Sequence, residues 1–207
     1  MRDFEDIQID YKVLEKELLE FENLLKEKSS LGEQEILDFF KDRSQLIASI
    51  GWFYPDLSLP NKISREYSIG GDFECDFIIG DSESKFYCFV EFENAEENSI
   101  FKKQGRSQLY WSSRFLNGFS QVVDWFWMLD DIAQTEKFKY TFGGSKNEIG
   151  YEGLLIIGRD KFIDLDKQRR INWWQNNIIV NSKHIKCLTF DRLAQIIRKR
   201  VDTFITN

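Results

Sequence analysis

The sequence contains little histidine, proline or cysteine, and each shortage excludes a class of protein. A single histidine, His184, and the absence of any Cys-x-x-Cys pair argue against a zinc site, because zinc is held by clustered Cys and His ligands. Two prolines in 207 residues argue against disorder and long linkers. Three cysteines, an odd number, indicate buried reduced thiols rather than a disulfide framework, so we expect a cytoplasmic protein.

Long apolar runs are also lacking. No stretch is apolar over the length of a membrane span, and the sequence starts with an acidic segment rather than a signal peptide, so we expect no membrane partner. The net charge is −7, but residues 1–40 hold twelve acids and five bases, whereas residues 159–207 hold five acids and eleven bases. A basic C-terminal portion permits phosphate contacts, and a solvated mixed surface explains the same charges equally well.

Two runs rich in aromatic and β-branched residues, 73–80 and 85–93, predict a pair of antiparallel strands joined by the polar loop 81–84. If Gly80 pairs with Lys85, side chains alternate between two faces. One face is then entirely apolar and contains Phe73, Cys75, Phe77, Ile79, Phe86, Cys88, Val90 and Phe92. The other face carries Ile78, Tyr87 and Phe89 near the turn, and Glu74, Asp76, Glu91 and Glu93 at the far end.

Four carboxylates on one end of a sheet face repel each other, so a compensating positive charge is expected. A divalent cation is one candidate, because Mg²⁺ and similar ions prefer oxygen ligands. The alternative is a hydrated sheet end whose acids pair with lysine or arginine. Spacing alone leaves both interpretations open.

The rest of the chain reads as an alternation of helices and strands. Residues 5–28 predict an amphipathic helix whose apolar seam is spaced as in a coiled coil, and this helix either dimerises or packs on its own domain. We further expect helices over residues 32–49, 100–114, 119–132 and 164–176, strands over 62–70, 152–158 and 186–190, and a final helix capped by Asp191. The expected helix 100–114 contains Lys102, Lys103 and Arg106, which are candidates for phosphate contacts or for a solvated surface.

The order of these elements resembles the core of PD-(D/E)xK nucleases, with Asp76 on the second strand of a meander and Glu91-Phe92-Glu93 on the third. More particularly, the chain resembles the Shedu anti-phage nuclease domain. The segments that carry this resemblance are 33–40, Asp76, 90–93, 121–125, 156–159 and 188–193. The resemblance implies an α/β fold with a restriction-endonuclease-like core, a mixed central sheet flanked by helices, over residues 31–207. Residues 1–30 would form an added N-terminal helix.

The resemblance also implies a metal-dependent DNA endonuclease that hydrolyses phosphodiester bonds. Asp76, Glu91 and the carbonyl of Phe92 would hold Mg²⁺ or Mn²⁺. Glu93 stands where the family usually has lysine; it would act as a general base or bind a second metal ion, and otherwise the site would be inactive.

Two further residues match functional positions of the family. Glu33 matches an additional acid, and Gln121 a motif glutamine, although both residue types are also common on helix surfaces. DNA is the expected partner, with a possible homo-oligomer through the N-terminal helix. The alternative function is a catalytically inactive nuclease fold used for DNA binding or assembly.

Overall fold

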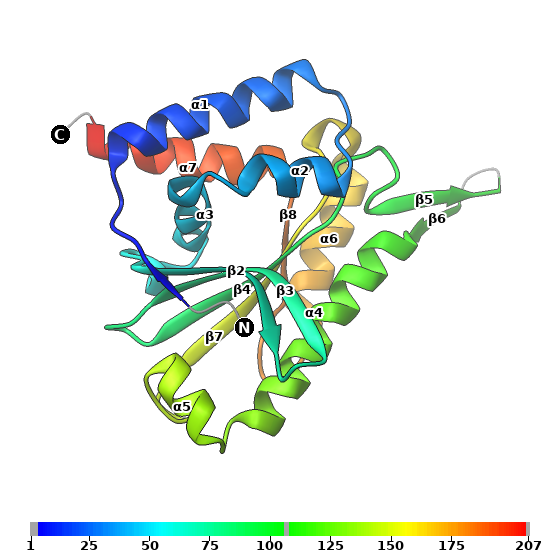
Figure 1. The fold of residues 1–207 in the computed structure, drawn as a ribbon. Helices are drawn as coiled ribbons and strands as arrows, with labels where there is room; N and C mark the ends of the chain where they lie inside the picture. Colours follow the sequence, from blue (N-terminus) through cyan, green and yellow to red (C-terminus); the bar gives the residue numbers. More distant parts are fainter. Residues whose placement is uncertain (1–3, 106–107, 206–207) are drawn as a thin grey trace.

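The computed structural model describes residues 4–105 and 108–205, and these form an α/β fold around a six-stranded sheet of order β1-β2-β3-β4-β7-β8 (Figure 1). The strands of this sheet are β1 (Glu5–Asp6), β2 (Lys62–Ile69), β3 (Phe73–Asp81), β4 (Phe86–Phe92), β7 (Gly150–Ile156) and β8 (Lys186–Leu188). Neighbouring strands from β1 to β4 are antiparallel, whereas β4, β7 and β8 run parallel. The predicted α/β class, with a mixed central sheet flanked by helices, is confirmed.

Helices cover both faces of this sheet (Figure 1). The helices are α1 (Tyr11–Glu27), α2 (Glu33–Phe40), α3 (Ser44–Ile50), α4 (Ser113–Ile132), α5 (Glu136–Phe142), α6 (Leu165–Asn177) and α7 (Phe190–Ile205). Short 3-10 turns lie at Gly51–Phe53, Pro55–Leu57 and Asp160–Phe162. One apolar core lies between the sheet and helices α1, α2, α3 and α7, and a second lies between the sheet and helices α4, α5 and α6. Within the described residues, no helix is both long and apolar enough to cross a membrane.

The predicted seam of the N-terminal helix packs against the chain itself. Helix α1 starts at Tyr11 because Asp10 caps its N-terminus, and β1 precedes it, so the predicted start at residue 5 was too early. The seam residues buried in the first core, against α7 and α3, are Leu14, Leu18, Phe21 and Leu25. Assembly of copies through this helix stays a prediction, as does the division at residue 30.

The hairpin of β3 and β4 forms as predicted, but its register differs by two residues. Gly80 pairs with Tyr87 instead of Lys85. An even shift leaves every side chain on its predicted face. It also moves Asp76 from a position opposite Phe89 to one level with Glu91, since Phe77 pairs with Val90.

The apolar face of this hairpin divides between the two cores. The segment from Phe77 onward packs into the first core as predicted, whereas Cys75 packs into the second, with Phe73 against it. Glu66 in β2 has a left-handed backbone with φ of 47°, between the pairs Arg65–Phe77 and Tyr67–Cys75, and this interrupts the regular pleat at the point where the packing direction changes. All three cysteines are buried and unbridged, as predicted.

The predicted helix over residues 100–114 was wrong, because this segment is a two-stranded hairpin of β5 (Phe101–Gln104) and β6 (Gln108–Trp111). Cross-strand contact between the rings of Phe101 and Trp111, whose centroids are 4.5 Å apart, outweighs local helix preference. Arg106 lies outside the described residues. Helix α4 also starts earlier than predicted and runs without a break through Gly118.

Three smaller predictions were also wrong. The helix predicted over residues 32–49 is two helices, α2 and α3, separated at residues 41–43. Helix α5 was not predicted at all. Asp191 does not cap the last helix; the side chain of Thr189 accepts the hydrogen bond from the N–H of Arg192, and Asp191 pairs with Arg159 instead.

Candidate functional site

The structure brings four of the predicted acids together at one end of the β3–β4 hairpin. Asp76 lies on β3, Glu91 on β4 and Glu93 directly after β4, while Glu33 lies in the first turn of α2. Repulsion from Asp76, Glu93 and Glu33 raises the pKa of Glu91, and Glu33 also raises the pKa of Asp76 and of Glu93. We call these four residues the acidic cluster.

Asp76 and Glu91 lie side by side on adjacent strands of the acidic cluster. Burial raises the pKa of both carboxyl groups, and repulsion from neighbouring acids raises it further. The N–H of Phe92 donates a 2.6 Å hydrogen bond to Oδ2 of Asp76, and Gln121 hydrogen-bonds Glu91; both bonds oppose the rise. Glu91 is only 6% exposed, so water compensates little of its charge.

Glu93 and Glu33 share one arginine. Arg114, whose side chain is 52% exposed, places Nη1 2.7 Å from Oε2 of Glu33 and 3.3 Å from Oε2 of Glu93. Burial and the nearby Glu33 raise the pKa of Glu93 to about 7 despite this arginine, because Glu93 is 4% exposed. Glu93 is therefore partly protonated near neutral pH.

One face of helix α4 forms the wall of the acidic cluster. Arg114, Gly118 and Gln121 are spaced by four and three residues, so they point the same way. A Cβ atom at Gly118 would lie 2.7 Å from Cδ1 of Leu155 and 3.1 Å from Cγ of Glu93. Glycine therefore allows α4 to approach the sheet closely enough for its neighbours to reach the acids.

The sequence identified the acids and Gln121 but missed Arg114 and Gly118. Their common spacing with Gln121 was the available signal, and the break predicted at residues 115–118 concealed it. Trp125 is buried in the second core, and Glu74 is exposed at the edge of the cluster.

The donor set suits a hard divalent cation with few protein ligands. Among the described residues, no three Asp, Glu, His or Cys side chains gather closely enough to hold a metal ion together. Mg²⁺ is usually bound by one or two carboxylates and keeps several waters, so Asp76 and Glu91 fit this requirement. Nothing tests the predicted role of the Phe92 carbonyl, which stays a prediction.

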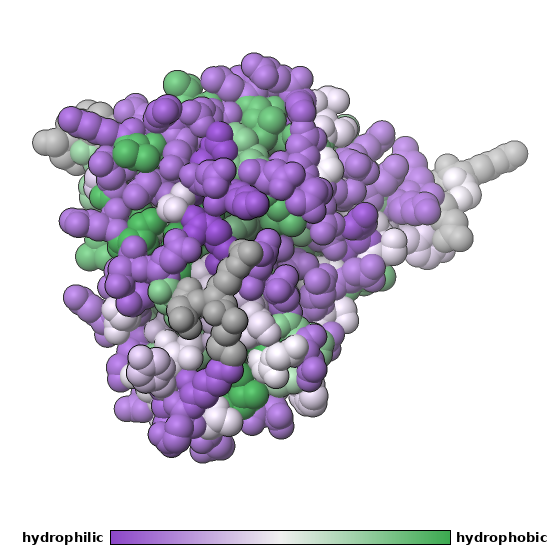
Figure 2. All heavy atoms as spheres, viewed as in Figure 1, coloured by the Kyte–Doolittle hydropathy of each residue, from purple (hydrophilic) through white to green (hydrophobic). Residues whose placement is uncertain are grey.

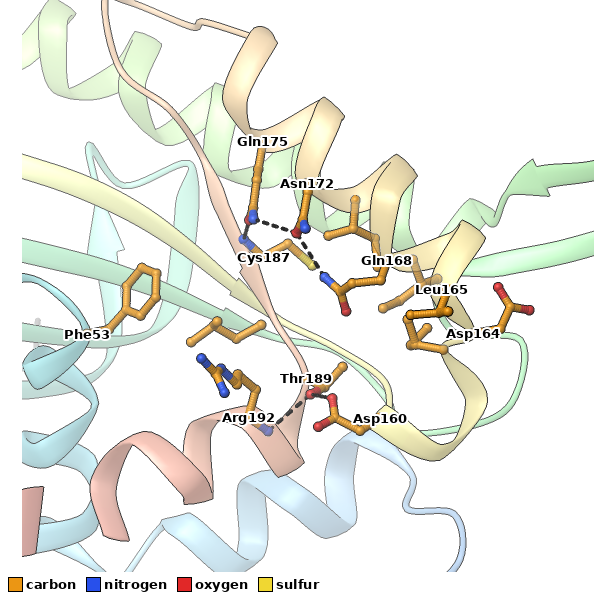
Figure 3. A pocket seen from close by; sticks show the side chains of 14 residues that line it. Phe53, Asp160, Asp164, Leu165, Gln168, Asn172, Gln175, Cys187, Thr189 and Arg192 are labelled. Atoms are coloured by element: carbon orange, nitrogen blue, oxygen red, sulfur yellow. Dashed lines mark hydrogen bonds between the residues drawn. The ribbon is translucent and has the colours of Figure 1, made fainter. Parts of the chain in front are cut away.

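A cavity of about 860 Å³ lies apart from the acidic cluster, between α6, β8 and the start of α7 (Figure 3). Three amide side chains of α6, those of Gln168, Asn172 and Gln175, point towards β8 in a ladder. Oε1 of Gln175 accepts a hydrogen bond from the N–H of Cys187 on the edge strand. The row of amides thus lies along β8 and satisfies the N–H of Cys187. None of the four acids lines the cavity.

A second group of buried charges lies near the ends of α1 and β7. The guanidinium of Arg159 pairs with both carboxylate oxygens of Asp191 at 2.8 and 3.0 Å, and it donates to the carbonyls of Leu25 and Lys28. The N–H of Asp160 donates to the same carboxylate. Burial alone would raise the pKa of Asp191, but the bonds from Arg159 and Asp160 lower it. We call this group the arginine node.

The sequence was compared with known proteins. Residues 30–194 match the family described as Shedu protein SduA, C-terminal. A comparison with curated proteins gives no match. The matched range includes the acidic cluster, the hairpin of β5 and β6, and Arg159, Asp160 and Asp191 of the arginine node. The chain therefore belongs to the Shedu SduA C-terminal family, and this membership points to a role in anti-phage defence.

Proposed function

We propose that the chain is a metal-dependent DNA endonuclease of the PD-(D/E)xK type, acting in anti-phage defence. The observation that carries the proposal is the convergence of the half-buried Asp76 and the buried Glu91 from adjacent strands, without a compensating cation of their own among the described residues. The mixed sheet, with its meander followed by a helix and a parallel strand, supports a restriction-endonuclease-like core.

Asp76 and Glu91 would hold Mg²⁺ or Mn²⁺ together with the Phe92 carbonyl. A bound ion of this kind polarises a phosphate and lowers the pKa of a water molecule. The hydrogen bond from the N–H of Phe92 fixes the Asp76 carboxylate, and Gln121 fixes Glu91, so both ligands are oriented before the ion binds.

Glu93 is suited to accept the proton of an attacking water. A general base works best when its pKa lies near the working pH, and the pKa of Glu93 is about 7. Arg114, adjacent to Glu93, supplies the positive charge that the lysine of the usual motif would bring. Because the base and the positive charge lie on two separate residues, the site can have Glu93 where the usual motif has lysine.

The test is cleavage of supercoiled plasmid by the purified chain with Mg²⁺ or Mn²⁺. We expect cleavage that a chelator abolishes and that falls at least about a hundredfold in Asp76→Ala and in Glu91→Ala, because loss of a ligand exceeds the effect of an outer-shell change. Glu83→Ala, at an exposed acid in the turn between β3 and β4, is the matched control and should cleave normally.

A second candidate is a catalytically inactive member of the fold that binds DNA or assembles with other copies. Glu93 at the position of the motif lysine favours it, because an ionised carboxylate can neither donate a hydrogen bond nor bring positive charge to a phosphate. DNA binding that weakens with salt, without cleavage under any divalent condition, would support this candidate and reject the nuclease proposal.

A further inference from the structure

In the sequence, the hairpin of β5 and β6 lies between two residues that meet at the acidic cluster. Glu93 precedes it in the chain and Arg114 follows it. The base of the hairpin is closed by a 2.9 Å hydrogen bond from the N–H of Ser112 to the carbonyl of Ile100. The hydroxyl of Ser99 donates at 2.8 Å to Oδ1 of Asn94, the residue after Glu93. The hairpin thus leaves the body of the protein at the cluster itself.

The half of the hairpin next to the body is held firmly. The ring of Trp111 stacks between those of Phe101 and Phe115, with centroid distances of 4.5 and 4.4 Å. The guanidinium of Arg170 lies 4.9 Å from the centroid of the Phe101 ring and donates a 2.8 Å hydrogen bond to the carbonyl of Leu109. These contacts fix the direction in which the hairpin leaves the protein.

The half of the hairpin beyond this stack projects away from the body (Figure 1), and hydrophilic residues cover much of the visible side (Figure 2). Lys102 and Lys103 are exposed on its opposite faces, since neighbouring strand residues alternate. Tyr110 is 42% exposed and pairs across the strands with Lys102. In the described ranges, neither lysine forms an ion pair.

The acidic cluster needs positive charge from outside itself if DNA is to approach. Its carboxylates repel phosphates, and Arg114 is already engaged by Glu33 and Glu93. Two exposed lysines on a projecting strand pair complement a phosphate backbone. A two-stranded hairpin is marginally stable in water alone, so a projecting one gains from a partner on its surface.

We propose that the hairpin of β5 and β6 is an arm that binds the phosphate backbone of duplex DNA entering the acidic cluster. Lys102 and Lys103 contact phosphates, and Tyr110 packs against the sugars beside them. They are positioning residues rather than catalytic residues. This inference rests on the proposed function, because it takes the DNA to be the substrate of the acidic cluster.

The test is duplex DNA binding by fluorescence anisotropy, without divalent ions, over a range of salt concentrations. The double variant Lys102→Glu/Lys103→Glu should bind several-fold more weakly to every sequence, and its slope of log affinity against log salt should fall by about 2, one for each lost phosphate contact. The double variant Lys12→Glu/Lys16→Glu, on the exposed side of α1, changes the net charge equally and should bind like the wild type. Matching melting temperatures would show that all the variants fold.

If the hairpin variant keeps the affinity and the salt slope of the wild type, the proposal that the hairpin binds DNA is wrong. It is also wrong if the wild-type chain does not bind duplex DNA. Plasmid cleavage tests the nuclease proposal independently. Plasmid cleavage that depends on Glu91 but not on the hairpin would leave the nuclease proposal standing and reject the arm. Binding that depends on the hairpin, without cleavage in any divalent ion, would support the arm as a DNA contact and reject the nuclease.

Discussion

The arginine node and the acidic cluster are two ways of burying charge in one chain, and they differ in how the charge is compensated. At the node, Arg159 is 4% exposed. The carboxylate of Asp191 compensates its charge, and the carbonyls of Leu25 and Lys28 accept hydrogen bonds from its guanidinium. At the cluster, the half-exposed Arg114 contacts Glu33 and Glu93, and in the described part of the chain Asp76 and Glu91 form no ion pair. The pKa of Asp191 is lowered at the node, whereas the pKa values of Asp76, Glu91 and Glu93 are raised at the cluster.

A difference of this kind is expected between a structural site and a functional one. The node joins the end of α1 to β7 and α7, so its charges stabilise the fold. The cluster makes the fold less stable whenever its acids are ionised. Perturbed pKa values of this kind are typical of functional sites, where a ligand supplies the missing charge. The following predictions change one region and leave the other as its reference.

The largest expected effect is at the arginine node. Arg159→Ala should lower the free energy of unfolding by about 3–5 kcal/mol, because it leaves the half-buried Asp191 without its partner and the carbonyls of Leu25 and Lys28 without their donor. Denaturant unfolding followed by circular dichroism measures this loss. Arg169→Ala, which removes an exposed arginine of α6, is the control and should change stability by less than about 1 kcal/mol. Equal losses in the two variants would mean that the node contributes no special stability.

A smaller effect is expected at the wall of the acidic cluster. Gly118→Ala should lower the free energy of unfolding by about 1–3 kcal/mol, since its Cβ atom meets Leu155 and Glu93 at contact distances that are too short. Asn117→Ala, at the neighbouring exposed position of α4, should be neutral or slightly stabilising because alanine favours helix. Chemical denaturation of both variants decides this. A stabilised Gly118→Ala protein would show that α4 does not need its close approach.

The smallest effect for any one side chain concerns pH. The folded chain holds protons on Asp76, Glu91 and Glu93 at pH values where the unfolded chain has lost them, so their contribution to stability is present at acid pH. It is lost as pH rises through about 7 for Asp76 and Glu93, and through about 10 for Glu91. Asp191 has the opposite sign, and its contribution is lost only as pH falls below the ordinary range of a carboxyl group.

With a chelator present, the melting temperature should therefore fall between about pH 6 and pH 8, and each carboxyl whose folded pKa lies near 7 should contribute about 1.4 kcal/mol, or about 3–6 °C. The same scan on Glu91→Gln should be flatter, because the amide removes one of the ionising groups. A wild-type melting temperature that rises over this interval would contradict raised pKa values in the cluster.

Local patterns predicted the central hairpin and the acids it carries. Side chains alternate between the two faces of each strand from Phe77 to Phe92. The faces were therefore assigned correctly, because a shift of two residues in register leaves every side chain on the same face. The pattern could not show that Asp76 and Glu91 lie side by side. That depends on the turn, where the structure pairs Asp81 with Phe86. Residues 100–114 failed for another reason: the hairpin is held by contacts distant in sequence, such as that of Trp111 with Trp174 of α6, which no helix propensity encodes.

The candidate site was predicted on the strands and missed on the helix. Acids on adjacent strands have a fixed spacing, so Asp76, Glu91 and Glu93 could be grouped from sequence. The role of Arg114 depends on how closely α4 approaches the sheet, and Gly118 sets that distance through packing against Leu155. In the sequence, the same glycine reads as the end of a helix.

The account depends on Asp76 and Glu91 sharing a divalent cation. The most direct measurement is the anomalous signal of Mn²⁺ in crystals of the chain, with crystals of Glu91→Gln soaked in the same way. We predict a peak between the carboxylates of Asp76 and Glu91 in the wild type, and its loss in the variant. A wild-type crystal with no peak there, or a peak that Glu91→Gln leaves unchanged, would contradict the account.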